Sequence, residues 1–196
     1  RLLPRKDQLE ATIMSRLAAW NWCPICKEKL RRAIPEGDDR ERLCCTACGL
    51  IIYDNPAPCA CAVVVRDEKV LLTRRAVEPA LGLWDLPGGY IEIGETPEET
   101  LKRELLEETG LEVRIAGFIG FFVDTYGDGG SDTLNISYEC AVVAGLESPG
   151  SDVAELGWFL PDALPAPHQL AFRNTREALE RWLASRGQRR AAQSKQ

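Results

Sequence analysis

Apolar and polar positions follow two different periods along this chain, and each change of period marks an element. A continuous apolar, largely β-branched run from Cys59 to Arg66 predicts a buried strand, and Val70–Arg75 predicts its antiparallel return after a turn at 67–68. Further strands are predicted at 113–126, 134–143 and 158–160, and a closing helix at 168–185. Strands mixed with helices and short hairpins predict an α/β domain with a mixed sheet.

The stretch before the strand at 113–126 contains a helix that signals both of its ends. Thr96 is a good N-cap, Pro97 suits the first helical position, and Glu99 completes a capping box three residues after Thr96. Gly110 suits a left-handed residue that ends the helix. The sequence therefore predicts a helix between Pro97 and Thr109.

Three carboxylates share one arc of this helix, and local rules disfavour their positions. Glu104, Glu107 and Glu108 fall within roughly 100° of one another, next to a face formed by Leu101 and Leu105. Glu104 and Glu108 are like charges four residues apart, and Glu107 and Glu108 sit at the negative end of the helix dipole. Carboxylates at positions that local helix rules disfavour indicate a functional role. Carboxylate oxygens are the ligands that Mg²⁺ and Mn²⁺ prefer, so we expect a metal site here.

Eight cysteines occur, and four of them form two C-x-x-C pairs. Cys23 and Cys26 are followed, after 18 residues, by Cys45 and Cys48, which is the spacing of a structural Cys₄ zinc ribbon. Cys44 is a rival ligand, but Cys45 keeps the C-x-x-C spacing. The remaining thiols fall in strand-like runs and are expected to be buried packing residues: Cys59, Cys61 and Cys140.

Charge and hydropathy exclude some classes of protein. The net charge is −6 over 196 residues, which gives no general attraction to nucleic acid or to an anionic membrane. No apolar run is long enough to span a bilayer, and no signal peptide is visible, so a cytoplasmic location is expected. The chain starts at Arg1 and its only methionine is Met14, which leaves open a missing preceding segment with a targeting signal.

These patterns divide the chain into four segments. We expect an N-terminal helical segment at 1–19, a zinc ribbon at 20–53, the α/β domain at 54–186 and a disordered basic tail at 187–196.

The helix and the turn before it resemble the signature of a known family. Gly89, five residues, Glu95, seven residues and then Arg103-Glu-Leu-Leu-Glu-Glu-Thr-Gly-Leu111 is similar to the Nudix box without a departure. The resemblance implies the α/β/α sandwich of Nudix hydrolases. It also implies Mg²⁺- or Mn²⁺-dependent hydrolysis of a nucleoside diphosphate linked to another moiety.

The resemblance also implies roles for residues of the box. Glu104 and Glu108 are expected to be direct metal ligands, and Glu107 a ligand or the base that activates water. The carbonyl of Gly89 is expected to complete the metal shell. Arg103 is expected to orient a box glutamate, with Glu95 as its partner.

Further candidates lie outside the box. Glu155 is a candidate for a further catalytic acid; the equal alternative is that it is a solvated glutamate in a loop. One of Arg74 and Arg75 is expected to bind phosphate and the other to lie on the surface. Trp84 and Tyr90 are candidates for stacking on a base, although buried packing is the better expectation for Trp84. Tyr126 is a substrate-binding candidate because a tyrosine in this region resembles dinucleoside polyphosphate hydrolases, with a structural role at the hairpin end as the equal alternative.

A zinc ribbon before a Nudix domain resembles the NADH pyrophosphatase branch and its relatives that act on ADP-ribose or FAD. The Ser-Gln-Pro-Trp-type motif of the NADH branch is absent after the box, so the choice among these substrates stays open. The alternative is a nucleic-acid- or protein-binding regulator whose Nudix domain senses a ligand without turnover. Residues 23–48 carry six Lys/Arg against five Asp/Glu, which argues against nucleic acid. The sequence leaves open whether the protein forms a homodimer.

Overall fold

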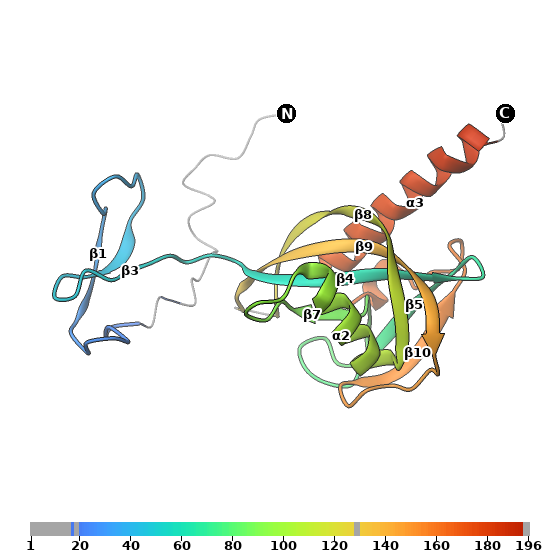
Figure 1. Cartoon of the computed structure of the whole chain (residues 1–196), viewed down its shortest axis with the longest axis horizontal. Helices are drawn as coiled ribbons and strands as arrows, with labels where there is room; N and C mark the ends of the chain where they lie inside the picture. The colour runs from blue at the N-terminus through green and yellow to red at the C-terminus, as the bar shows by residue number, and fades with distance from the viewer. Residues whose placement is uncertain (1–16, 18–19, 128–129, 194–196) are drawn as a thin grey trace. The chain divides into compact units, whose positions relative to one another are not determined.

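The computed structural model describes residues 17, 20–127 and 130–193 (Figure 1). The helix expected within 1–19 therefore lies outside the described residues, apart from Leu17. The chain divides into two compact units, with the break between Asn55 and Pro56.

The first unit is a small three-stranded antiparallel sheet in the order β1-β2-β3. Its strands are β1 (Leu30–Ala33), β2 (Arg42–Cys45) and β3 (Ile51–Ile52). One small cluster of buried side chains fills its centre: Leu17, Cys23, Leu30, Leu43 and Cys45. Two of these five side chains are thiols, so the apolar core is too small to stabilise this unit by itself.

The second unit is built on a seven-stranded mixed sheet with the main order β10-β5-β4-β9-β8. The strands are β4 (Ala57–Arg66), β5 (Lys69–Arg75), β6 (Trp84–Asp85), β7 (Gly88–Tyr90), β8 (Leu111–Thr125), β9 (Asp132–Gly145) and β10 (Val153–Phe159). β4 and β9 run parallel at the centre, and the other pairs are antiparallel. The mixed sheet predicted from the sequence is confirmed.

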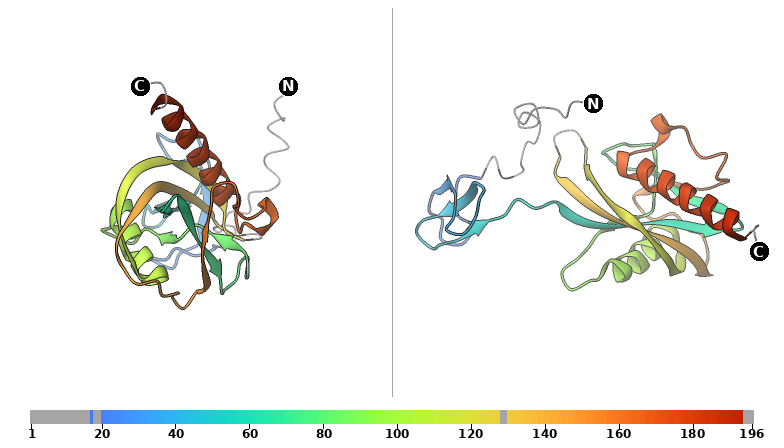
Figure 2. Two further views of the ribbon diagram at one scale, coloured as in Figure 1. Left: turned by 90° about the vertical axis from the view of Figure 1, so that its right-hand side faces the viewer. Right: turned by 90° about the horizontal axis from the view of Figure 1, so that it is seen from above.

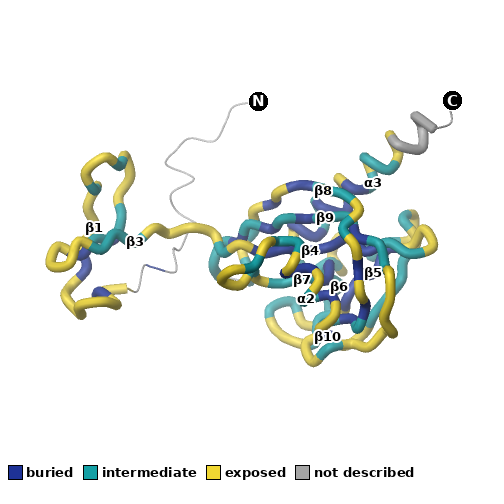
Figure 3. Tube along the Cα trace, viewed as in Figure 1, coloured by how far each residue is buried: buried dark blue, intermediate teal, exposed yellow. Residues whose placement is uncertain are grey.

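Two helices cover the two faces of this sheet (Figure 2). α2 (Pro97–Thr109) packs Leu101 and Leu105, both fully buried, against one face. α3 (Arg173–Gln193) packs Ala178, Leu179 and Trp182 against the other. The central strand β4 supplies alternating residues to both layers and is buried along most of its length (Figure 3).

The ends of α2 are those that the sequence predicts. The side chain of Thr96 accepts a hydrogen bond from the backbone N–H of Glu99, and the Glu99 side chain accepts one from the N–H of Thr96. Gly110 closes the helix at φ 70°, in the left-handed region. α2 therefore has a fixed start and end, which fixes the directions of Glu104, Glu107 and Glu108.

The short strands β6 and β7 are not among the strands predicted from the sequence; they form because they pair with β5 and β4. The predicted bounds of the closing helix and of the tail are wrong. The closing helix begins at Arg173, after a 3₁₀ turn at Pro167–Gln169, and continues to Gln193. Residues 187–193 are therefore helical, where a disordered tail is predicted.

Candidate active site and zinc site

Glu104 and Glu108 of α2 line a cavity of about 310 Å³ beside the turn that carries β7. Gly88 and Gly89 of β7 line the same cavity, and so does Asp152, which lies just before β10. Residues from three separate parts of the chain thus meet around the carboxylates of one helix. The predicted metal-binding residues Glu104, Glu108 and Gly89 are brought together here.

Glu108 is held at the back of the cavity by a backbone donor. The N–H of Gly88 donates to Oε2 of Glu108 at 2.9 Å. Burial raises the pKa of Glu108, the hydrogen bond from Gly88 opposes the rise, and the neighbouring carboxylates of Asp152, Glu104 and Asp85 add to it, so that the pKa is about 8. A cation at this point would restore the ionised form of Glu108.

Glu104 lies against the backbone of Gly89. A Cβ on residue 89 would approach Oε1 of Glu104 to 2.4 Å, so glycine is required for this close approach. The Glu104 side chain is 16% exposed, and Nη1 of Arg103 donates to its Oε1 at 2.6 Å. Burial raises the pKa of Glu104, and Arg103 opposes the rise.

Arg103 also holds Glu95, as predicted. Its Nε and Nη2 donate to the two carboxylate oxygens of Glu95 at 2.7 and 2.8 Å, and Nη2 reaches the carbonyl of Tyr90 at 3.2 Å. The hydrogen bonds from Arg103 lower the pKa of Glu95 to about 2. Arg103 therefore links the loop before α2, the strand β7 and Glu104.

Glu107 lies apart from the other two box glutamates. Its side chain is 61% exposed, it does not line the cavity, and its Oε2 is 3.5 Å from Nη1 of Arg103. The structure places it at the solvent side of Arg103. To act as a ligand or base, as expected, the Glu107 side chain would have to extend from the surface of α2 toward the cavity.

The donor set of the cavity fits a hard divalent cation. Glu104, Glu108 and Asp152 offer carboxylate oxygens around one space, and the charge of Asp152 raises the pKa of both glutamates. The glycine backbone at Gly88 and Gly89 leaves room next to them. The fit depends on these oxygen ligands and on the crowding of their negative charge.

Asp152 was missed by the sequence analysis, which chose Glu155. Glu155 pairs across the strands with Arg74, its side chain is 54% exposed, and Nη1 of Arg74 lies 3.3 Å from its Oε2. It does not line the cavity. The bulge between Val153 and Glu155 shifts the register of β10, and this irregularity gives no signal in the sequence.

The two candidate arginines, Arg74 and Arg75, lie in different places. Arg74 is exposed, with Nε bound to the carbonyl of Gly82, while Arg75 lines the cavity. Successive strand residues point to opposite faces, so one of the two had to face inward, but the sequence does not say which.

The three aromatic substrate-binding candidates do not lie together. Trp84 does not line the cavity; it packs edge-on against Phe159 at 4.9 Å between ring centroids. Tyr126 does line the cavity, and its hydroxyl accepts a hydrogen bond from Nη2 of Arg75 at 2.8 Å. Tyr90 also lines it, 6.1 Å from Tyr126 between ring centroids.

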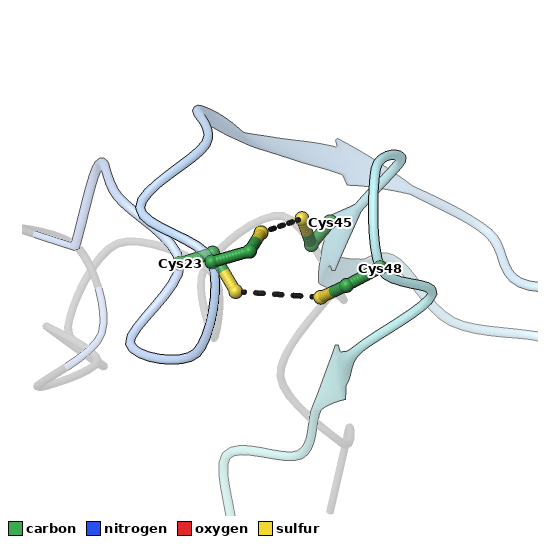
Figure 4. A group of neighbouring side chains, drawn as sticks. Cys23, Cys45 and Cys48 are labelled. Carbon is green, nitrogen blue, oxygen red and sulfur yellow. Dashed lines mark hydrogen bonds between the residues drawn. The ribbon is translucent and has the colours of Figure 1, made fainter.

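The four predicted zinc ligands converge in the first unit (Figure 4). The sulfur atoms of Cys23, Cys26, Cys45 and Cys48 all lie within 4.8 Å of one another. The Sγ atoms of Cys23 and Cys48 are 3.6 Å apart, and those of Cys26 and Cys45 are 3.4 Å apart. Zn–S bonds of about 2.3 Å in a tetrahedron require sulfurs separated by about 3.8 Å, so the cluster fits zinc.

Both C-x-x-C turns have the same local structure. Lys27 and Gly49 each donate a backbone hydrogen bond to the carbonyl of the first cysteine of their pair, at 3.0 and 2.9 Å, and both have positive φ. Backbone N–H groups within the turns lower the pKa values of Cys23 and Cys45, which favours the thiolate that zinc binds. The cysteines outside the cluster at 59, 61 and 140 are buried free thiols, as expected.

Protein-family models match both units of the chain. A model of the NUDIX domain matches residues 56–182, and a model described as Nudix N-terminal, a zinc ribbon, matches residues 21–54. Together with the sheet between two helices and the carboxylate-lined cavity, these matches identify the chain as a hydrolase. The chain belongs to the Nudix hydrolase family, in a branch that carries an N-terminal zinc ribbon.

Individual relatives agree with this membership. An ADP-ribose pyrophosphatase of Methanocaldococcus jannaschii is 34% identical over 62% of this chain and 70% of its own length. An NAD-capped RNA hydrolase NudC of Pseudomonas aeruginosa is 29% identical over 77% of this chain and 53% of its own length. A crystal structure of a NUDIX hydrolase from Nitrosomonas europaea superimposes with a TM-score of 0.74 at 28% identity, covering 86% of this chain and 93% of that one.

The chain spans about half the length of the NudC relatives that it matches. A relative named for capped RNA leaves the question of a nucleic-acid partner open, although the charge balance of the ribbon argues against one. No helix in the described part of the chain is long and apolar enough to cross a membrane.

Proposed function

We propose that this enzyme hydrolyses the pyrophosphate bond of a nucleoside diphosphate linked to another moiety, of the ADP-ribose, NADH or FAD class, with Mg²⁺ or Mn²⁺. The observation that carries the proposal is the convergence of Glu104, Glu108 and Asp152 on one cavity beside Gly88 and Gly89. The relative named ADP-ribose pyrophosphatase supports the substrate class.

A pyrophosphate resists attack because its oxygens are already anionic. A divalent cation, when bound, neutralises these oxygens and lowers the pKa of bound water. Glu104, Glu108 and the carbonyl of Gly89 would hold it, and Asp152 adds a fourth oxygen donor from outside the helix. Without a cation, the six carboxylates that line the cavity would repel the substrate: Asp85, Glu92, Glu104, Glu108, Asp124 and Asp152.

The residues of the chain then have separable tasks. Arg103 fixes Glu104 through a 2.6 Å hydrogen bond and is itself fixed by Glu95. Glu107 is exposed next to Arg103, so it can exchange a proton with solvent and accept one from the attacking water. Glu108 accepts a hydrogen bond from the Gly88 N–H, which joins α2 to β7.

The surroundings of the cysteines support a cytoplasmic location. All eight are free in the structure, four of them gathered as a metal site, which fits a reducing compartment.

The test is a panel of ADP-ribose, NADH and FAD, with and without Mg²⁺, on the wild type and on Glu108→Gln. Wild type should release phosphomonoesters only with the metal, and Glu108→Gln should lose at least about 100-fold in turnover because metal-based stabilisation is worth several kcal/mol. Glu112→Gln, an exposed glutamate at the start of β8, is the matched control and should retain full activity. Near-normal turnover of Glu108→Gln at saturating Mg²⁺ would refute the assignment.

A further inference from the structure

The three-stranded sheet of the first unit has a core face and an open face. Its core face carries three apolar side chains that pack with the buried cluster of the unit: Leu30, Leu43 and Ile52. Successive residues of a strand point to opposite sides, and residues directly opposite each other on paired strands point to the same side. The pairs Lys29–Trp22 and Arg31–Cys44 therefore lie on the other side of the sheet, which we call the open face. Three of the four residues of β1 are exposed (Figure 3).

Aromatic rings stand at the two ends of the open face. Trp22 is 64% exposed and makes no ring contact with a described residue, and Tyr53, directly after β3, is 51% exposed. The guanidinium of Arg42, which pairs with Ala33 at the far end of β1, lies over the Tyr53 ring at 4.9 Å from its centroid. Lys29 and Ala33 are four residues apart, so the rows that carry the two rings are about 13 Å apart along the strand. The two rings are too far apart to cover each other.

Cations lie on β1 between these two rings. Lys29 and Arg31 are exposed, and neither forms an ion pair with a described residue. Arg42 is the third cation of the open face, and its Nε lies 3.0 Å from Oδ2 of Asp38. The part of the open face next to Trp22 therefore carries two positive charges that no described carboxylate neutralises.

The even count of charges in the ribbon hides this distribution. Residues 23–48 carry six Lys/Arg against five Asp/Glu, but four of the five acids lie at 36–41, between β1 and β2. Asp38 pairs there with Arg42, and Asp39 lies 4.0 Å from Arg40. The near-neutral total therefore does not describe the open face, where an anionic partner is attracted.

A second copy of this chain is a poor partner for the open face. In a symmetric dimer the same patch meets itself, so its cations would approach their own counterparts. Unpaired like charges brought together across an interface oppose association.

Exposed rings that flank unpaired cations suit a ligand with flat apolar faces and an anionic backbone. Single-stranded nucleic acid has both, because its unpaired bases can stack on aromatic side chains while its phosphates contact Lys and Arg. The bases of a duplex already stack on one another, so a flat sheet with two rings favours the single strand.

We propose that the open face binds single-stranded nucleic acid, with Trp22 and Tyr53 stacking on bases and with Lys29 and Arg31 contacting the phosphates between them. This function belongs to the first unit and does not depend on which diphosphate the second unit cleaves. It gives the zinc site a purpose beyond stability, because the metal holds together the sheet that presents these side chains.

The first experiment measures the fluorescence anisotropy of a labelled oligodeoxythymidylate of about 15 nucleotides, the upper range of single-strand site sizes, with the full zinc-loaded chain and no Mg²⁺. Arg31→Glu and Arg32→Glu form a matched pair, since they are adjacent, exposed and equal in charge change but lie on opposite faces of β1. Arg31→Glu should weaken binding by about tenfold or more and lower the slope against log salt by about 0.7 or more, the value for one phosphate contact. Arg32→Glu should stay within about threefold of wild type. Equal losses in the two variants, or no binding by wild type, would overturn the proposal.

The second experiment separates stacking from charge. Trp22→Ala should weaken binding by about tenfold or more with an unchanged salt slope, whereas Trp22→Phe, which keeps a ring, should retain most of the affinity. Zinc content should equal that of wild type in every variant, which shows that the first unit is intact. Displacement of the oligonucleotide by polyglutamate or by a duplex of equal length, as effectively as by unlabelled single strand, would overturn the proposal in favour of an acidic protein or a duplex. A wild-type dimer that Arg31→Glu dissociates and Arg32→Glu does not would assign the open face to a second copy instead.

Discussion

Arg103 and Glu95 form a two-pronged ion pair, with Nε to Oε1 at 2.7 Å and Nη2 to Oε2 at 2.8 Å. Because the guanidinium is planar, this pair also sets the direction of Nη1, which donates to Glu104 at 2.6 Å. The loop before α2 thereby determines where a carboxylate of the active site points. We propose that Arg103 contributes to catalysis by positioning Glu104.

Replacing Arg103 by lysine tests this positioning. A lysine carries the same charge but cannot bind both Glu95 oxygens and Glu104 in fixed directions, so turnover should fall by about tenfold or more. The Mg²⁺ concentration for half-maximal activity should rise, which a purely structural role would not require. Lys102→Arg, the exposed neighbour, is the control and should leave both quantities unchanged.

Gly89→Ala tests the contact between β7 and Glu104. A Cβ at residue 89 would lie 2.4 Å from Oε1 of Glu104, so the carboxylate must move away from the cavity. We expect most of the activity to be lost while thermal unfolding changes by a few degrees at most. Gly117→Ala in β8 meets no atom within 4 Å and should be active. An active Gly89→Ala would show that Glu104 does not need its observed position.

The box helix was predictable because its signals are local. Thr96, Glu99 and Gly110 act within a few residues of themselves, and the structure has the cap and the end they predict. The partner of Arg103 was predictable from the family resemblance. By contrast, β6 and β7 exist through pairing with distant strands, so no property of residues 84–90 alone identifies them.

Asp152 and Glu155 provide a direct comparison between the structural and the sequence-based assignment. Asp152 lines the cavity and Glu155 pairs with Arg74 on the outside. Asp152→Asn should therefore lower turnover by about tenfold or more, as expected for loss of one charged oxygen donor. Glu155→Gln should stay within about twofold of wild type, because exposed ion pairs contribute little. The reverse order of effects would restore Glu155 as the further acid.

Asp152, the cavity residue that the sequence did not identify, precedes a bulged strand. It reaches the cavity through long-range packing that leaves no periodic pattern in the sequence. The cluster of four cysteines was predictable because two C-x-x-C turns are the sequence spacing that a tetrahedral zinc site requires.

Zinc removal separates the two metal sites. Cys23→Ser should lose the zinc and unfold the first unit, because its small core depends on the metal. Cys44→Ser, next to a ligand but outside the cluster, should keep one zinc ion per chain. The measurement is metal content beside turnover after dialysis. Wild type should keep zinc and regain turnover when Mg²⁺ alone is restored; equal zinc in both variants would contradict the assigned ligands.

Hydrolysis of ADP-ribose in ¹⁸O-labelled water, with the products identified by mass, tests the central claim most directly. Attack on a phosphorus of the pyrophosphate predicts AMP and ribose 5-phosphate in equal amounts, with one ¹⁸O atom in a phosphate group and none in a sugar carbon–oxygen bond. The reaction should stop when Mg²⁺ is chelated and resume when it is returned. Label on a sugar carbon, or inorganic phosphate as the first product, would contradict the account.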